Sequence, residues 1–287
     1  MTTLQDKVVL IVGAGREPGP SIARALAAQG AVVALNDLSP VPLDPLVTAI
    51  QASGGRANSY VGDATRGMPL RAMLDEVLAD WDRIDVLINN PRVQPLTPLM
   101  EMDEWDWQRT VEMNLNGPFL VTQLCAKLMR EQGEGVVINI IESEQAAAHG
   151  PARAAYAASQ AGLLALTRSA AKELMAYNIR VYGLCPDPVM LSNQESTIAF
   201  PPGNVSTDPL PTETMSTNKV LPPSSVSSSN PAPGSSGDAL AQMVVFLSSE
   251  ASRQLPGQIL QVGAQEREQA AKQPDSRRNK SWSLSAS

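Results

Sequence analysis

Residues 7–30 read KVVLIVGAGREPGPSIARALAAQG and decide the fold. An apolar, largely β-branched run opens the stretch and predicts a strand that is buried on both faces. Gly13, Gly15 and Gly19 follow, and a helical pattern then runs to Gly30, a residue suited to end a helix. Such a turn lets the backbone approach a pyrophosphate, and the helix N-terminus supplies N–H groups. The turn indicates nucleotide binding; the alternative is a purely structural turn, which also favours glycine.

The unit of strand and helix repeats along the chain. Further apolar runs occur, with helical patterns between them, at residues 31–37, 57–63, 85–90, 135–141, 179–185 and 256–263. Repeated units of this kind, joined by right-handed crossovers, build a doubly wound parallel sheet that binds ligands at the carboxyl ends of its strands. The sequence therefore predicts an α/β protein with a single-domain Rossmann fold of about seven strands, formed by residues 1–190 and 238–264.

The pattern of strands and helices is interrupted at residues 191–237. Of these 47 residues, 24 are Ser, Pro or Thr and only four are charged. So little apolar surface does not offset the entropy lost on ordering, which predicts a disordered or loosely attached insertion. Residues 265–287 are polar with mixed charge and predict a mobile tail. The RRNK cluster in this tail is either part of a solvated end or a contact for an acidic partner.

Charge and hydropathy exclude several classes of protein. The net charge of -7, without a stripe of Lys and Arg before the tail, argues against a nucleic-acid partner. No stretch reaches the roughly 20 apolar residues that cross a bilayer, and the N-terminus lacks a signal-like apolar region. Cys125 and Cys185 lie in apolar surroundings without metal-ligand spacing, which predicts neither a disulfide nor a metal site. We therefore expect a cytoplasmic protein.

Asp37 is a second candidate for nucleotide binding. It ends the second predicted strand, 24 residues beyond Gly13. A carboxylate at this position accepts hydrogen bonds from both ribose hydroxyls of NAD and repels the 2′-phosphate of NADP. Asp37 therefore favours NAD as the cofactor. The alternative is a turn aspartate in the segment NDLSP that caps the next helix.

The order of several motifs resembles the short-chain dehydrogenase/reductase superfamily. After the glycine-rich turn come a strand-end aspartate, a pair of asparagines, a helix asparagine, a serine after the fifth strand and a helix tyrosine, here Asp63, Asn89, Asn90, Asn114, Ser143 and Tyr156. The resemblance extends over residues 7–185 and 239–262. It implies pairing of subunits through two long helices, here residues 103–132 and 152–177, so we expect a homo- or hetero-oligomer with subunits of this family.

The resemblance implies a role for each matching residue. Asp63 and Ala64 would contact the adenine of the cofactor, and Asn90, with the neighbouring asparagine, would lie beneath the cofactor. Asn114 would anchor a water molecule of a proton relay. Tyr156 would be the general acid/base that exchanges a proton with the substrate oxygen.

The serine that polarises the substrate carbonyl is assigned to a different position when it is counted from the helix tyrosine than when it is counted from the strand asparagine. Ser143 lies 13 residues before Tyr156, which is the usual offset. Counting from the strand asparagine, Asn139, puts the serine's place at Glu142. Ser143 is the predicted catalytic residue, with Glu142 as the alternative.

The sequence departs from the family pattern at the cofactor and catalytic positions. The departures are Val12, Glu17, Pro91, Arg92, Asp187 and Gln160. Glu17 replaces a glycine of the turn and brings negative charge towards a diphosphate, although Arg16 beside it could compensate. We therefore expect Arg16 among the cofactor-binding residues and weakened binding of NAD.

Gln160 stands where the family has its active-site lysine, four residues after Tyr156. The Gln160 amide can still hydrogen-bond the nicotinamide ribose, but it supplies no charge, so the phenol stays protonated at neutral pH. Arg153, one helical turn before Tyr156, either restores charge or, as we expect, lies exposed on a solvated turn.

Two functions follow from these departures. The insertion at 191–237 takes the place of the family's substrate lid and has few apolar anchors. Together with the changed residues, this predicts a family member whose dehydrogenase activity is impaired or absent, such as the non-catalytic subunit of a hetero-oligomer. The alternative is an active NAD-dependent oxidoreductase that reduces a small ketone or oxidises a secondary alcohol.

Overall fold

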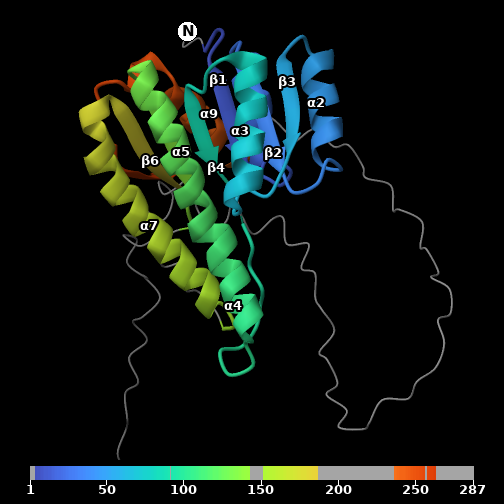
Figure 1. Cartoon of the computed structure of the whole chain (residues 1–287), viewed down its shortest axis with the longest axis vertical. Coiled ribbons are helices and arrows are strands. Elements are labelled where there is room, and N and C mark those ends of the chain that lie inside the picture. The colour runs from blue at the N-terminus through green and yellow to red at the C-terminus, as the bar shows by residue number, and fades with distance from the viewer. Residues whose placement is uncertain (1–3, 91, 143–150, 187–235, 256, 263–287) are drawn as a thin grey trace, which may run out of the picture.

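The computed structural model describes residues 4–90, 92–142, 151–186, 236–255 and 257–262. Within these residues the protein is a parallel sheet of seven strands in the order β3-β2-β1-β4-β5-β6-β7, with helices on both faces (Figure 1). The strands are β1 (Val8–Val12), β2 (Val32–Asp37), β3 (Arg56–Val61), β4 (Val86–Asn89), β5 (Gly135–Ile140), β6 (Ile179–Pro186) and β7 (Ile259–Val262). The predicted doubly wound Rossmann fold is confirmed.

Two layers of helices enclose the sheet. On one face lie α1 (Gly19–Ala28), α2 (Leu43–Ala52) and α9 (Ser236–Ser248), which share one apolar core with the sheet. On the other face lie α3 (Gly67–Trp81), α5 (Gly117–Gln132) and the long α7 (Ala154–Leu174) (Figure 1). Because both faces are covered, side chains of both orientations along a strand are buried, which explains the unbroken apolar runs in the sequence.

The segment 103–132 is one long helical pattern in sequence but three elements in the structure. It contains α4 (Glu104–Val111), a π-helical turn over Glu112–Asn116, and α5. Short π-helical turns inside α-helices often occur at functional sites, because the wider turn re-aims the side chains that follow. Asn114 lies in this turn and is fully buried.

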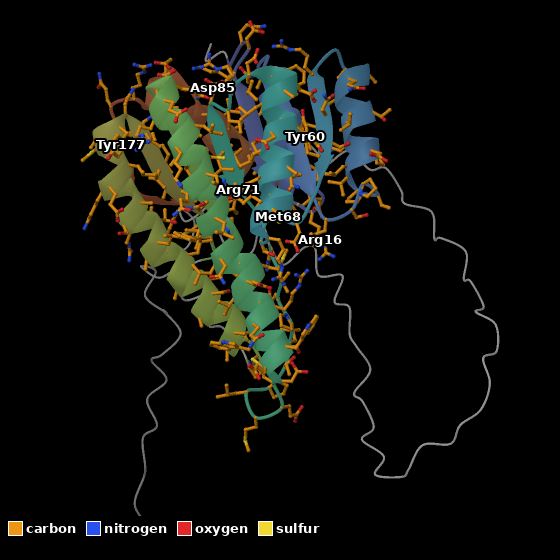
Figure 2. All side chains as sticks on the ribbon, in the orientation of Figure 1. Arg16, Tyr60, Met68, Arg71, Asp85 and Tyr177 are labelled. Carbon is orange, nitrogen blue, oxygen red and sulfur yellow. The ribbon has the colours of Figure 1, made fainter. Side chains whose placement is uncertain are left out.

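Parallel pairing brings the carboxyl ends of the strands to one edge of the sheet. Val12 of β1 pairs with Asn36 of β2 and with Asn89 of β4, and Asn89 pairs with Asn139 of β5. Figure 2 shows Arg16 near this carboxyl edge and Asp85 near the opposite, amino edge. Residues that follow β1, β2, β4 and β5 therefore meet in one region, where the sequence predicted the site.

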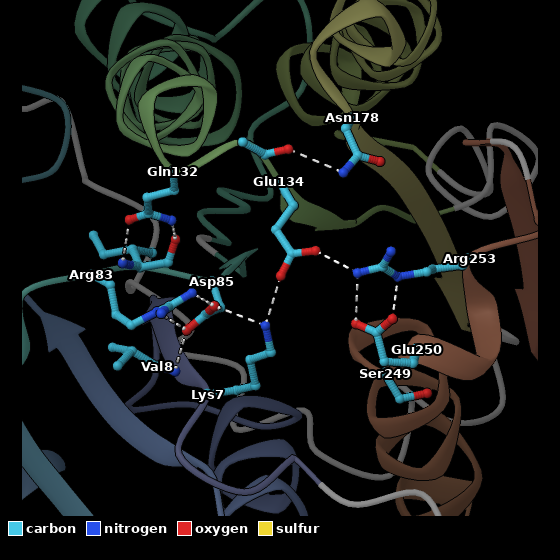
Figure 3. A network of polar contacts seen from close by, with 12 residues as sticks. Lys7, Val8, Arg83, Asp85, Gln132, Glu134, Asn178, Ser249, Glu250 and Arg253 are labelled. Carbon is cyan, nitrogen blue, oxygen red and sulfur yellow. Dashed lines mark hydrogen bonds and ion pairs between the residues drawn. The ribbon is translucent and has the colours of Figure 1, made fainter.

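A network of charged side chains joins the amino ends of the strands (Figure 3). Asp85, just before β4, accepts hydrogen bonds from the backbone N–H of Val8 at 2.8 Å and from Arg83 Nε at 2.9 Å. Lys7 Nζ lies 3.1 Å from Asp85 Oδ1 and 2.9 Å from Glu134 Oε1, just before β5. Glu134 also pairs with Arg253 at 2.6 Å. These contacts fix the register of β1, β4 and β5, and they lie at the edge of the sheet opposite the predicted site.

Several sequence-based expectations concern residues outside the described part of the chain. The insertion predicted at 191–237 lies there except for its last two residues, which begin α9. The predicted tail at 265–287 lies there completely. Among the helices that the structure describes, none has both the length and the apolarity of a membrane span.

Removal of the buried Asp85 carboxylate should destabilise the fold more than removal of Arg253, an exposed cation of the same network. We expect Asp85→Ala to lower the free energy of unfolding by about 2–3 kcal/mol, because a backbone N–H and two cations lose their common acceptor. Arg253→Ala, at an ion pair that is half exposed, should lower it by less than about 1 kcal/mol. Urea denaturation monitored by circular dichroism measures both values. Equal losses in the two variants would contradict this reading of the network.

Candidate active site

The glycine-rich turn between β1 and α1 closes tightly on the end of β2. The backbone N–H groups of Gly13 and Ala14 both donate to the carbonyl of Asn36, at 3.0 and 2.9 Å. Gly13 has a φ of 76°, which favours glycine. The N–H of Gly15 donates to Asp37 Oδ2 at 3.0 Å, and a Cβ on Gly15 would lie only 2.6 Å from that oxygen. The turn therefore requires glycine to approach Asp37 this closely.

Asp37 faces the glycine-rich turn. Its Oδ1 accepts a hydrogen bond from the N–H of Leu38 at 2.7 Å, and its Oδ2 from Gly15. The helix α2 begins after Pro42 and has no side-chain cap, so the alternative in which Asp37 caps this helix is not observed. A carboxylate oxygen has further lone pairs, so Asp37 retains acceptor capacity for ribose hydroxyls.

Asn90 and Asp63 complete this side of the carboxyl edge. Asn90 Nδ2 donates to the carbonyls of Gly13 at 2.9 Å and of Arg16 at 3.2 Å and so braces the turn. Asp63 Oδ1 accepts from both the N–H and the hydroxyl of Thr65, at 2.9 and 2.6 Å. Burial raises the pKa of Asp63, but these two hydrogen bonds and the positive charges of Arg109 and Arg66 together outweigh it, so the pKa is lowered overall. The adjacent Ala64 is buried.

Glu17 of the turn points to α1. Its Oε2 accepts from the N–H of Ser21 at 3.3 Å, and its Oε1 lies 3.5 Å from Arg24 Nη2. The cation paired with Glu17 is therefore Arg24 of α1, whereas the side chain of Arg16 is exposed. Arg16 contributes its carbonyl, which accepts from Asn90.

Asn114 is held by the backbone of a neighbouring loop. Its Oδ1 accepts from the N–H of Val93 at 2.8 Å, and its Nδ2 donates to the carbonyl of Val93 at 2.7 Å and to the Ser159 hydroxyl at 3.1 Å. The two hydrogen bonds with Val93 hold the loop after β4 at the π-helical turn, and the third links this turn to α7. Asn114 thus contacts α7 at Ser159, about one helical turn after Tyr156. The Ser159 hydroxyl in turn donates to the Tyr156 carbonyl.

The hydroxyl of Tyr156 donates to Glu142 Oε2 at 2.6 Å. Both residues are nearly inaccessible, Tyr156 at 2% and Glu142 at 8% exposure. Gln160 is also buried, and its side-chain oxygen accepts from the backbone N–H of Glu142 at 2.9 Å. The three residues form one connected group, and within the described residues a carboxylate is the hydrogen-bond acceptor of the phenol.

Two arginines flank this group. Arg153 lies with its guanidinium 5.2 Å from the centre of the Tyr156 ring and 3.3 Å from Glu142 Oε1. Arg92 lies 5.8 Å from the ring centre and 3.4 Å from Glu142 Oε2. The side chain of Arg153 is only 15% exposed. The expectation that it lies exposed on a solvated turn was therefore wrong, because its position one turn before Tyr156 directs it to the buried carboxylate.

The acidity of Tyr156 reflects these opposing charges. Burial raises the pKa of its phenol, the positive charge of Arg92 lowers it, and the charge and hydrogen bond of Glu142 raise it again. The pKa is raised overall. At neutral pH the phenol is therefore protonated, with its proton directed to Glu142.

The structure brings together some of the predicted residues and leaves others untested. Glu142, the alternative position for the family's serine, makes contact with Tyr156. Ser143, Pro91 and Asp187 lie outside the described residues. The catalytic role of Ser143 therefore stays a prediction. Arg92 was expected only as a departure from the family pattern, and its position beside Tyr156 was not predicted. The one available signal was its position directly after a strand end, at the edge where ligands bind.

Neutralising Glu142 should make the phenol more acidic. We expect Glu142→Gln to lower the pKa of Tyr156, because the negative charge disappears while Arg92 and Arg153 remain. Ultraviolet titration of tyrosinate measures this, and Tyr156→Phe identifies the signal among the four tyrosines. Glu101→Gln, which removes an exposed carboxylate, is the matched control. An unchanged titration in Glu142→Gln would contradict the contact.

Comparison with known proteins agrees with the fold and with the family resemblance. The sequence profile of a family described as short chain dehydrogenase matches residues 7–199. An uncharacterized oxidoreductase of Thermotoga maritima is 37% identical over 182 residues, which cover 63% of this chain and 71% of that protein. A 3-oxoacyl-acyl-carrier-protein reductase of the same organism is 35% identical over 184 residues, covering 64% and 74%.

A solved structure extends the similarity over more of the chain. The crystal structure of a metagenomic short-chain oxidoreductase in complex with NADP is 27% identical in sequence and has a TM-score of 0.69. The match covers 90% of this chain and 98% of that chain.

Proposed function

Since this chain belongs to the short-chain dehydrogenase/reductase family, we propose that it is a nucleotide-binding member whose dehydrogenase chemistry is impaired. The observation that carries the proposal is the hydrogen bond from the Tyr156 hydroxyl to Glu142 at 2.6 Å. In this reading Tyr156 is the family's acid/base and Asn114 assists it. Glu142, the alternative to Ser143, takes the place of the polarising hydroxyl, whereas Ser143 would be the polarising residue of an active enzyme.

A general acid must direct its proton to the substrate. Here the phenol proton is directed to a buried carboxylate, and a charge-assisted hydrogen bond of this kind is about twice as strong as a neutral one. Transfer of the proton to a substrate oxygen would break this bond. Uptake of a proton in the opposite direction requires tyrosinate, which the neighbouring negative charge disfavours. Both directions of proton exchange are therefore hindered.

Gln160 does not relieve this hindrance. Its side-chain oxygen accepts from the Glu142 backbone, so it fixes the strand end that carries the carboxylate. A neutral amide at this position supplies no charge to lower the pKa of the phenol. The residue in the lysine position thus supports Glu142 instead of activating Tyr156.

The cofactor that suits the carboxyl edge is a nicotinamide dinucleotide. The relative solved with NADP has the same fold. Asp37 at the end of β2 favours NAD over NADP, because a carboxylate repels a 2′-phosphate. Asp63, Ala64 and Asn90 lie on the same edge, where they suit the adenosine half of such a cofactor. Glu17 adds negative charge to the turn and weakens binding.

A second candidate function is an active NAD-dependent oxidoreductase for a small ketone or secondary alcohol. The favouring observation is the pair of guanidinium groups, 5.2 and 5.8 Å from the centre of the Tyr156 ring. Positive charge near a phenol stabilises tyrosinate, so Arg92 and Arg153 could replace the missing lysine. Their shared ion pairing with Glu142 reduces this effect, which is why the impaired function is preferred.

A partner subunit of the same family is part of the proposal. The helices α4, α5 and α7 pack against one another and extend beyond the sheet (Figure 1). Trp105, Trp107 and Phe119 expose large apolar surfaces in α4 and α5. A homo- or hetero-oligomer formed through these helices would cover them, and an active partner would supply the chemistry that this chain lacks.

Restoring a hydroxyl and a lysine should restore turnover. We expect Glu142→Ser combined with Gln160→Lys to reduce small ketones at least about 10²-fold faster than the wild-type chain, the lower range for positioned acid/base catalysis. Initial rates of NADH oxidation, with NADH and a ketone panel both at the highest attainable concentrations, measure this. Each single variant shows whether one change suffices.

Two controls separate chemistry from folding. Adding Tyr156→Phe to the double variant should abolish the gain, because the acid/base itself is then lost. Thermal unfolding of all variants should remain cooperative. Turnover by the wild-type chain at ordinary enzymatic rates, in the absence of any other subunit, would refute the impaired function and support the active oxidoreductase.

A further inference from the structure

The first turn of α1 has already used the N–H groups that would bind a phosphate. Pro18 and Pro20 have no N–H. Gly19 donates to the carbonyl of Arg16 at 2.9 Å, and Ile22 donates to the carbonyl of Pro18 at 3.0 Å. The remaining N–H, that of Ser21, donates to Glu17 Oε2. Every N–H from residue 19 to residue 22 is therefore donated within the chain.

The anion at this helix N-terminus is the chain's own carboxylate. A helix N-terminus carries a partial positive charge that stabilises an anion, and Glu17 supplies that anion here. Arg24, one turn further along α1, pairs with it at 3.5 Å. A diphosphate at this position would meet a like charge and would have to displace the carboxylate from both partners.

The close approaches of the glycines are explained without a ligand. A Cβ on Gly19 would lie 2.7 Å from the carbonyl oxygen of Ala14. A Cβ on Gly15 would lie 2.6 Å from both Asp37 Oδ2 and Pro42 Cγ. The glycines thus allow the turn to fold on itself. They are not evidence of room for a diphosphate.

The misfit is confined to the phosphates. Asp37 keeps lone pairs for ribose hydroxyls, and in the proposed function Asp63 and Ala64 contact the adenine. An adenosine without phosphates meets no repulsion from Glu17. The residues at the carboxyl edge therefore suit the adenosine end of a dinucleotide and oppose its centre.

We propose that Glu17 is an internal competitor for the diphosphate of a nicotinamide dinucleotide at the N-terminus of α1. The carboxylate occupies the anion position of the turn, and binding of the cofactor requires its displacement. This inference rests on the proposed nucleotide-binding role of the carboxyl edge. It is independent of the state of Tyr156.

Neutralising Glu17 should strengthen binding of phosphate-bearing ligands alone. Isothermal titration of the full chain with NADH, and separately with adenosine, measures this in the wild type and in Glu17→Gln. We expect the Kd for NADH to fall about tenfold or more in Glu17→Gln, which corresponds to about 1.4 kcal/mol. The Kd for adenosine should change by less than about twofold, because adenosine has no phosphate for Glu17 to repel. If the wild type shows no binding of adenosine, Glu17→Gln should show none either.

Further variants make the outcome specific. Glu76→Gln removes an equal charge from an exposed position on α3 and should leave binding of NADH unchanged. Glu17→Gly removes the side chain altogether and should also strengthen binding of NADH, which keeps the test valid if one variant folds poorly. Circular dichroism and thermal unfolding report on folding.

The possible results separate this inference from the proposed function. Micromolar binding of NADH by the wild type would contradict the proposal that Glu17 competes with the diphosphate. An unchanged affinity for NADH in both Glu17 variants would contradict it too. An equal gain for NADH and adenosine also overturns it, because the effect would then not depend on phosphate. Tight binding of NADH without turnover would overturn the competitor and leave the impaired chemistry intact. Stronger binding in the Glu17 variants, still without turnover, supports both.

Discussion

Parallel pairing of seven strands directs every strand's carboxyl end to the same edge of the sheet, and the chemistry of this protein depends on that constraint. β1, β2, β4 and β5 end side by side, with the pairs Val12–Asn36 and Asn89–Asn139 in register. The residues after each strand have no further ladder to join, so their polar groups meet there. At the amino edge, Asp85 and Lys7 hold β1, β4 and β5 in this register.

Two carboxylates change the electrostatics of the carboxyl edge. Glu17 lies at the N-terminus of α1, and Glu142 lies beside the phenol of Tyr156. Each is held by an arginine and by a hydrogen-bond donor of the chain, so each is stabilised in place. A dinucleotide-dependent oxidoreductase needs positive potential at both positions, one for phosphates and one for a tyrosinate. The fold of the family is thus combined with a carboxylate at each of these two positions.

The sheet and most of the helices could be predicted from local patterns. Each expected strand agrees with an observed strand to within three residues at either end, because an apolar run buried on both faces is a strong local signal. Gly30 follows the C-cap of α1, Gln29, and has a φ of 87°, as expected of a glycine that ends a helix. The π-helical turn at Glu112–Asn116 was not expected, because the apolar pattern continues through it and only contacts with the Val93 backbone reveal its purpose.

The sequence by itself determined the order of the strands and helices, the nucleotide-type turn and the identities of Gln160 and Glu17, because these follow from local periodicity and motif spacing. Only the tertiary structure showed that Glu142 contacts Tyr156. Counting along the chain left Ser143 and Glu142 open, and it gave no indication that Arg92 and Arg153 converge on Glu142. These residues come from the ends of different elements. Their pairing is selected by burial, because an isolated carboxylate beside a buried phenol requires cations nearby, and no local pattern records that requirement.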